Sequence, residues 1–429
     1  MVDQPGLEVA PSTPPEAVLH FPSTLKSFTA REDKYFVRIS SEETNSTVLI
    51  NPTQTLRTRR SKKKIILWVG ILFIVIVAVA AILGGVLGSR RSGNSSPTLA
   101  SPSPTSTPVP PDSPRLNSRL TASGWRINGG FFKLRVFYQD QSDDLRFSEY
   151  NNDGRGWARS QKVEREGVLS ITGMGATSIL YSDPMEFFFL SKSSFLSGSN
   201  FKEGTTPFGG VDDSIDSYPL SLHSKSRLGT YWPYIVMQKP DLSLHLVAVT
   251  AFPVWQNRSL GISALEGTAL AVVPQSTSYD NPNPAALMYR RNDGLLSLCS
   301  LNFNLTCNDM GVATIDLPQT SSFGAFAVAR KGDTKNATDM YILYQNASND
   351  LEYSHYFGGS WEPGQVANAL KNADPSTDIT CLTEGIWPGY AVMSSAYDMS
   401  RCYFLSNGRV REVGFDGMTW TDMGEVPLE

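Results

Sequence analysis

The chain has 429 residues, with 41 acidic and 37 basic side chains and a formal net charge of −4 at pH 7. This balance argues against nucleic acid as a partner, because a nucleic-acid-binding surface needs a strongly basic face. The length exceeds that of one small domain and the composition changes sharply along the chain, so we expect several parts of different character.

The first part of the chain, residues 1–64, is rich in Pro, Ser, Thr and charged residues and has few apolar stretches. Such a composition buries too little apolar surface to offset the conformational entropy of folding. We therefore predict a disordered tail over residues 1–64.

A continuous apolar run without charged side chains follows at Ile65–Gly88. At about 1.5 Å per residue, a helix over this run spans a hydrocarbon core of about 30 Å with some tilt. A buried core helix is the alternative, but a helix this long that is apolar on every face is unusual. A cleaved signal peptide is disfavoured, because the run starts far from the N-terminus. We predict a single transmembrane helix at Ile65–Gly88, with the lipid bilayer as a partner.

Basic residues flank the apolar run unequally. Those on its N-terminal side are Arg57, Arg59, Arg60, Lys62, Lys63 and Lys64, and those that follow closely are Arg90 and Arg91. The positive-inside rule then places the N-terminus in the cytosol and the C-terminal part outside the cell or in a lumen.

The next stretch, residues 89–120, contains the Pro/Ser/Thr-rich sequence Ser92–Pro114. Such sequences form no core and favour extended conformations. We predict a stalk over residues 89–120 that separates a C-terminal domain from the bilayer.

The remainder of the chain contains two similar copies of one sequence segment, called the repeated phrase below. Lys133–Trp157 reads KLRVFYQDQSDDLRFSEYNNDGRGW, and Asp339–Trp361 reads DMYILYQNASNDLEYSHYFGGSW. Each phrase has two alternating arms around a run of turn-forming residues, a pattern typical of a β-hairpin. Self-similarity of this kind indicates a repeat architecture.

The end of the first arm recurs about every 50 residues, as expected for one propeller blade of about four short strands. The six equivalent positions are Gln139, Leu190, Gln238, Arg290, Gln345 and Leu405. We therefore predict an all-β, six-bladed β-propeller over residues 121–429. The alternative is a two-sheet sandwich with unrelated hairpins.

The cysteines and glycosylation sequons agree with an oxidising location for this domain. An even number of cysteines suggests two disulfides. The four cysteines can pair in three ways. The pairing between cysteines that are close in sequence is Cys299–Cys307 with Cys381–Cys402. Sequons for N-glycosylation after the apolar run begin at Asn94, Asn257, Asn304, Asn336 and Asn346.

Motifs for catalysis are missing from the sequence, which has no nucleophile elbow, no H-E-x-x-H and no P-loop. Acidic pairs that could hydrolyse glycosides are too numerous to discriminate. We expect no enzymatic activity, no cofactor and no metal site.

The short motifs of these units resemble the blades of the fungal fucose-specific lectins. The resemblance lies in Arg135–Gln139 followed by Gly154–Trp157, and in Val410–Glu412 with Asp416–Trp420. It covers about residues 128–427. It implies a six-bladed propeller that binds L-fucose between neighbouring blades. Each such site would use an Arg on one strand, a Glu on the next and aromatic side chains from the adjoining blade.

The family's Arg and Glu can be placed residue by residue. The Arg position, four residues before the Gln139 position, holds Arg135, Glu186, Tyr234, Ala286, Tyr341 and Arg401. The Glu position holds Phe147, Leu298, Tyr353 and Glu412 in the first, fourth, fifth and sixth units, and the other two units do not align. Among the four units that align at both positions, only the sixth has both groups, Arg401 and Glu412. Arg135 has Glu149, on the same strand as Phe147, as an alternative partner.

Candidate carbohydrate-binding residues are therefore Arg401, Glu412, Arg135, Glu149, Trp157 and Trp420. A cross-strand salt bridge without a ligand is the alternative for Arg401 and Glu412. Packing between blades is the alternative for Trp157, Trp361 and Trp420, which end their units. The leading hypothesis is a membrane-anchored, lectin-like protein that binds fucosylated or related glycans. The second is a propeller that lost its sugar sites and serves as a structural or protein-interaction module. The third is a glycosidase.

Overall fold

The computed structural model describes residues 110–428, with gaps at 128–129, 179–184, 202–210, 213, 252–253, 278–284, 303, 314, 316, 319–320 and 386–392. The tail, the apolar run Ile65–Gly88 and most of the stalk lie outside the described residues. Among the residues that are described, no helix is both long and apolar enough to cross a membrane.

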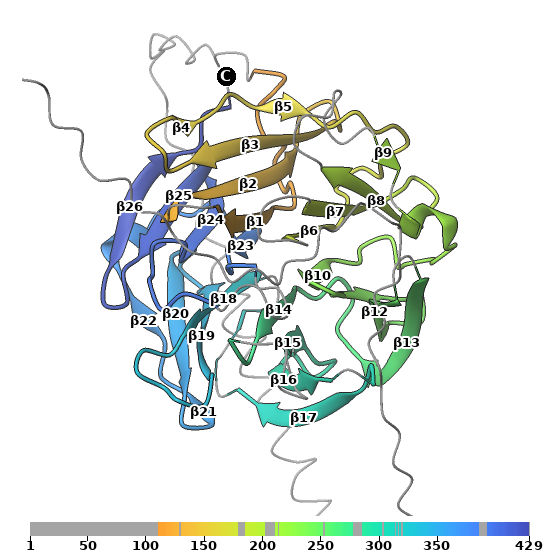
Figure 1. Ribbon diagram of the computed structural model, residues 1–429. Helices are drawn as coiled ribbons and strands as arrows, with labels where there is room; N and C mark the ends of the chain where they lie inside the picture. Colours follow the sequence, from red (N-terminus) through yellow and green to blue (C-terminus); the bar gives the residue numbers. More distant parts are fainter. Residues whose placement is uncertain are drawn as a thin grey trace, which may run out of the picture. The chain divides into compact units, whose positions relative to one another are not determined.

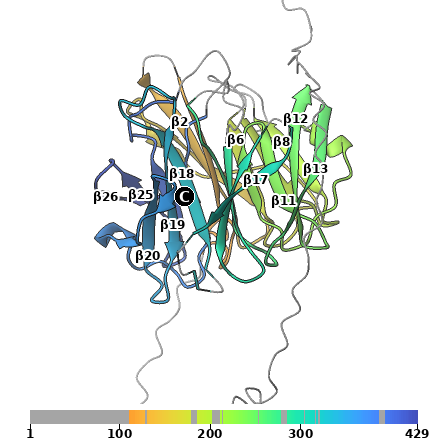
Figure 2. The same ribbon diagram turned by 90° about the horizontal axis from the view of Figure 1, so that it is seen from below.

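The described residues form six antiparallel sheets that are arranged around a common centre (Figure 1), and the turned view shows their strands lengthwise (Figure 2). The all-β six-bladed propeller predicted from the repeats is confirmed. Blade 1 has β1 (Thr121–Arg126), β2 (Phe132–Gln139), β3 (Leu145–Asn151), β4 (Gly156–Trp157) and β5 (Gln161–Lys162). Blade 2 has β6 (Met174–Ser178), β7 (Met185–Leu190), β8 (Leu196–Phe201) and β9 (Val211–Asp212), followed by the 3₁₀ turn η2 (Ser214–Ser217). Blade 3 has β10 (Leu228–Tyr231), β11 (Tyr234–Gln238), β12 (Ser243–Ala251) and β13 (Val254–Ser263).

The other three blades repeat this order. Blade 4 has β14 (Leu270–Pro274), β15 (Ala285–Arg290), β16 (Leu296–Leu301) and β17 (Cys307–Val312). Blade 5 has β18 (Phe323–Ala329), β19 (Thr338–Gln345), β20 (Leu351–Phe357), β21 (Ser360–Trp361) and β22 (Gln365–Val366), followed by η3 (Asn368–Leu370). Blade 6 has β23 (Ile379–Cys381), β24 (Arg401–Ser406), β25 (Arg409–Phe415) and β26 (Trp420–Glu425).

The first strand of each blade lies nearest the centre (Figure 1), and these strands contact one another in a closed ring in the order β1, β6, β10, β14, β18 and β23, with β23 again touching β1. Small residues permit this approach. A Cβ atom on Gly175 of β6, for example, would lie 2.4 Å from Cγ2 of Thr230 on β10.

Each of the six junctions between blades is filled by its own apolar cluster. At the junction of blades 1 and 2, Phe137 and Phe187 stack with ring centroids 4.3 Å apart, and Phe147 and Phe201 meet edge to face. Burying each such side chain contributes about 1.5–3 kcal/mol. The aromatic and β-branched residues of the repeats therefore hold neighbouring blades together.

The glutamines that end the second strand of blades 1, 3 and 5 are structural. Gln238 is fully buried at the end of β11, and its side chain donates to the carbonyls of Leu242, Ala264 and Leu265 and accepts from the N–H of Gly267. It thus ties the hairpin turn of blade 3 to the segment that enters blade 4. Gln139 and Gln345 make the corresponding bonds in blades 1 and 5.

The packed part of the chain begins before residue 121. The N–H of Arg115 donates to the carbonyl of Gln139, and Ser118 and Leu120 are buried. The segment just before β1 therefore belongs to the propeller rather than to the predicted stalk of residues 89–120.

Candidate functional site

The strand pairing confirms the alignment of the Arg and Glu positions. In blade 6, Glu412 pairs with Tyr403, two residues after Arg401. The same relation holds in the other aligned blades, with Phe147 opposite Phe137, Leu298 opposite Met288 and Tyr353 opposite Leu343. It places Gly198 and Leu246 at the Glu position of blades 2 and 3, which the sequence did not align. Blade 6 is thus the one blade with both groups.

Arg401 and Glu412 form an ion pair at the junction of blades 6 and 1. Nη1 of Arg401 lies 2.6 Å from Oε1 of Glu412, and the hydroxyl of Tyr403 donates to the same oxygen at 3.1 Å. The two charged residues are 7 % and 2 % exposed. The pair is therefore buried.

Blade 1 supplies an aromatic wall to this ion pair. The guanidinium carbon of Arg401 lies 4.6 Å from the ring centroid of Tyr150 and 5.2 Å from that of Phe132. These distances are typical of cation–π contacts. Nε1 of Trp157 donates to Oε2 of Glu412 at 3.1 Å. The predicted set of Arg, Glu and aromatics from the adjoining blade is assembled here.

The electrostatic environment of the cluster determines the protonation states of Arg401 and Tyr403. Burial alone would lower the pKa of Arg401, but the charge of Glu412 and the hydrogen bond to Glu412 raise this pKa above its ordinary value. Burial and the carboxylate of Glu412 raise the pKa of Tyr403 well above its usual range. At neutral pH the cluster therefore presents a guanidinium and a neutral phenol. Such groups recognise hydroxyls beside an apolar wall.

Arg135 lies in a different environment, at the junction of blades 1 and 2. Its Nη2 atom is 2.7 Å from Oε2 of Glu149, which stands directly opposite in the strand register. Its guanidinium carbon lies 5.1 Å from the ring of Trp125 and 5.4 Å from that of Phe201. The pairing of Arg135 with Glu149 is confirmed, but these two residues are not part of the Arg401 cluster.

Trp420 also lies apart from the Arg401 cluster. It packs at the junction of blades 5 and 6, with its ring 4.9 Å from Phe415 and 5.6 Å from Tyr353. Tyr341, at the Arg position of blade 5, lies 5.1 Å from Phe415 in the same apolar cluster. Aromatic rings thus occupy this junction where a sugar site would need an Arg and a Glu.

Several residues of the Arg401 cluster were missed by sequence reasoning. Tyr403 follows Arg401 by two residues, so the alternation of a strand placed it on the same face. Phe132 lies on β2 just before the repeated phrase and Tyr150 lies on β3 within it, but neither carries a charged group that suggests a site. Trp255, which pairs with Val249 as Trp157 pairs with Tyr150, was also missed, because the third unit lacks the Gly-rich ending.

Both predicted disulfides are present, Cys299–Cys307 in blade 4 and Cys381–Cys402 in blade 6. Of the sequons, Asn257, Asn304 and Asn336 are exposed. The amide of Asn346 instead donates to Oε1 of Glu352 at 3.0 Å, so this sequon is the least accessible of the four. Asn94 lies outside the described residues.

Comparison with known proteins finds similarity at the level of structure. No protein-family model and no curated protein sequence matches the chain. AofleA from Arthrobotrys oligospora matches with a TM-score of 0.57 and 14 % identity, over 71 % of this chain and 85 % of that one. The fucose-specific lectin of Aleuria aurantia matches with a TM-score of 0.54 and 16 % identity, over 73 % of this chain and 97 % of the lectin.

This chain has the fold of the fungal fucose-specific lectins. A bacterial lectin with this fold, BP39L from Burkholderia pseudomallei, also matches, with a TM-score of 0.51 and 11 % identity over 72 % of this chain and 84 % of that one. The family resemblance drawn from the repeated motifs is therefore confirmed for the fold. These lectin-fold neighbours agree with the expectation of a protein that is not an enzyme, which remains a prediction.

Proposed function

We propose that this protein is a single-pass, membrane-anchored lectin that binds fucosylated glycans at the junction of blades 6 and 1. The observation that carries the proposal is the buried Arg401–Glu412 pair beside Tyr150 and Trp157 of the next blade. The Aleuria aurantia lectin, which has the same fold, is described as fucose-specific. Arg401 would donate to ring hydroxyls, Glu412 would accept from them, and the aromatic wall would contact the apolar face of the sugar.

Fucose binding should depend on the geometry of both charged groups. We expect Arg401→Lys and Glu412→Gln each to weaken the binding of methyl α-L-fucoside by about 10–100-fold, the effect of losing a hydrogen bond to a charged group. The measurement is calorimetric titration of the full-length chain in detergent.

Matched substitutions distinguish recognition from general damage. Arg409→Lys and Glu425→Gln change an exposed ion pair on the same blade, where the side chains are 55 % and 57 % exposed, and should leave the affinity unchanged. Thermal unfolding of each variant shows whether the propeller still folds. Absence of fucoside binding by the unaltered chain, or equal affinity in all four variants, would refute the proposal.

Membrane anchoring rests on the sequence of Ile65–Gly88 and its basic flank. We expect the full chain to resist extraction from membranes by carbonate. We also expect an N-glycanase to increase its electrophoretic mobility, since Asn257, Asn304 and Asn336 are exposed. The double substitution Ile74→Arg/Ile76→Arg should release the chain from membranes, because arginine at the centre of a span is strongly disfavoured. Extraction of the unaltered chain by carbonate would exclude the anchor.

A second function, a propeller without sugar binding that serves as an interaction module, is favoured by a specific observation. Both carboxylate oxygens of Glu412 already have partners, Arg401 and Tyr403 on one and Trp157 on the other. These three bonds use most of the accepting capacity of the carboxylate, so little of it is left for a sugar hydroxyl. The fucoside titration separates the two functions, because the interaction module predicts no saturable binding.

A further inference from the structure

A pocket lies at the junction of blades 4 and 5. Its volume is about 100 Å³, and its lining includes Leu298, Met310, Val312, Ala313, Tyr356 and Trp361. None of the residues that line it is charged. Its position between two blades corresponds to that of the Arg401 cluster, which lies two junctions further along the ring and has a different lining.

The aromatic wall of this pocket reproduces the wall supplied by blade 1. Trp361 stands opposite Tyr356 in the strand register, as Trp157 stands opposite Tyr150. The two pairs have nearly equal geometry, with centroids 5.3 Å apart and planes at 59° in blade 5, and 5.4 Å and 58° in blade 1. The indole of Trp361 is therefore placed as the indole of Trp157 is.

The blade 4 side of the pocket differs chemically from the corresponding blade 6 side of the Arg401 cluster. Leu298 occupies the register position of Glu412, and Ala286 occupies that of Arg401. Nε1 of Trp157 donates to Glu412, whereas Nε1 of Trp361 is buried and has no acceptor among the residues that the structure describes. Leaving a buried N–H without a partner is unfavourable, so an acceptor that enters the pocket gains a preformed donor.

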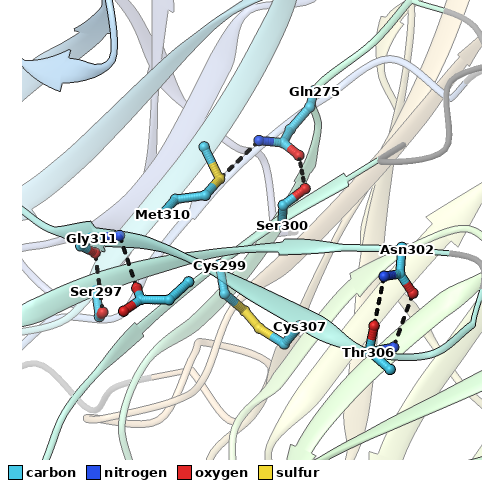
Figure 3. Close-up of a disulfide and its surroundings, with 10 residues drawn as sticks. Gln275, Ser297, Cys299, Ser300, Asn302, Thr306, Cys307, Met310 and Gly311 are labelled. Atoms are coloured by element: carbon cyan, nitrogen blue, oxygen red, sulfur yellow. Dashed lines mark hydrogen bonds between the residues drawn. A yellow bond between two sulfur atoms is a disulfide. The ribbon is translucent and has the colours of Figure 1, made fainter. Parts of the chain in front are cut away.

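The blade 4 side of the pocket is held in place (Figure 3). The side-chain amide of Gln275 donates to the sulfur of Met310 at 3.0 Å and accepts from Ser300 at 2.6 Å. The disulfide Cys299–Cys307 links β16 to β17 beside these bonds. The wall is thus preorganised, which reduces the conformational entropy lost on binding.

We propose that this pocket binds a small neutral ligand with an apolar body and one hydrogen-bond-accepting oxygen, such as a cyclic ketone. The apolar body would contact Leu298, Met310 and the ring of Tyr356, and the oxygen would accept from Nε1 of Trp361. The volume limits the size, because a pocket of about 100 Å³ is smaller than the cavity of about 150 Å³ that holds a benzene ring, so the ligand has fewer heavy atoms than benzene. Charged ligands are excluded, since no lining residue offers a counter-charge.

Cyclobutanone is a suitable probe, and the indole N–H resonance of Trp361 in the isotope-labelled full chain reports its binding. We expect a saturable shift of one indole resonance with a Kd on the order of 1 mM, as befits a ligand of about five heavy atoms. Cyclobutane, which lacks the acceptor, should bind at least about tenfold more weakly.

Three variants test where the ketone binds. Trp361→Phe removes the donor and identifies its resonance, and Leu298→Gln supplies an internal acceptor at the Glu412 position, so each should abolish the saturable shift. Trp157→Phe alters the equivalent ring of blade 1 and should leave the shift intact. A ketone-dependent shift that survives Trp361→Phe, an unaltered shift in Leu298→Gln, or no saturable shift in the unaltered chain would overturn the proposal. The outcome is independent of fucoside binding, which involves a different junction.

Discussion

Replacing Asp378 by alanine is expected to destabilise the propeller by about 3–5 kcal/mol, the usual effect of leaving a buried charge without its partner. Asp378 is 6 % exposed, just before β23. Its carboxylate accepts from Nη1 of Arg227, from the hydroxyl of Ser322 at 2.7 Å and from the N–H of Leu120 at 2.9 Å. These partners lie next to the first strands of blades 3, 5 and 1, so one carboxylate joins four blades across the centre of the ring.

The pKa values of this pair determine how the effect depends on pH. Burial alone would raise the pKa of Asp378, but the charges of Arg227 and Arg119 hold this pKa below its ordinary value. Burial lowers the pKa of Arg227 to about 10, so the guanidinium remains charged at neutral pH. Because the folded-state pKa of Asp378 is lowered, its stabilisation is complete above the unfolded-state value of about 3.9 and is lost as the pH falls through the folded-state value.

Denaturant unfolding of the unaltered chain and of Asp378→Ala, measured over a range of pH, checks both statements. The difference in unfolding free energy should be large at neutral pH and should shrink on acidification. Asp293→Ala removes a carboxylate that is 45 % exposed and should have little effect. The double substitution Arg227→Met/Asp378→Leu should recover much of the loss, because it leaves no buried charge unpaired. Equal stabilities of Asp378→Ala and Asp293→Ala would contradict this account.

Gln238→Leu is expected to destabilise the propeller by about 2–4 kcal/mol. The substitution keeps the side chain's approximate volume but removes bonds to three carbonyls and one N–H in the connection between blades 3 and 4. Buried backbone groups left without partners account for the loss. Denaturant unfolding of the purified chain measures it.

Gln256→Leu is the matched control, because Gln256 is exposed on β13. Its unfolding free energy should stay within about 0.5 kcal/mol of that of the unaltered chain. Blades 2 and 6 have leucine at the position of Gln238, at Leu190 and Leu405, so leucine itself is compatible with the strand. A loss no greater than that of the control would show that the glutamine bonds contribute little.

The fold could be predicted because its information is local and repeated. The spacing of Gln139, Gln238 and Gln345 marks the end of the same strand in three blades, and the structure shows why glutamine recurs there. The disulfides followed from the same logic, since both link residues of a single blade. The sequence of a hairpin indicates which of its own strands pair, and the repeat could be recognised because the hairpin occurs six times.

The contents of the junctions could not be predicted in the same way, because each junction combines residues from two blades. Trp157, Trp361 and Trp420 end their units alike, yet they meet Glu412, Leu298 and Tyr353 respectively. A pattern within one unit does not show what the neighbouring unit presents. The burial of Arg401 and Glu412 likewise depends on Phe132 and Tyr150, which lie far away in sequence.

The ring closes without sharing a strand between its first and last blades. In the part of the chain that the structure describes, the strands of each blade are consecutive in sequence. Blade 6 meets blade 1 through side-chain contacts such as Trp157 with Glu412 and Arg126 with Glu384, and through one isolated backbone bridge between Gly124 and Glu384. A glycan held by Arg401 and the rings of blade 1 would therefore bind only the closed ring. By mass action, the bound glycan would then raise the free energy needed to open the propeller, once the glycan concentration exceeds the Kd of the complex.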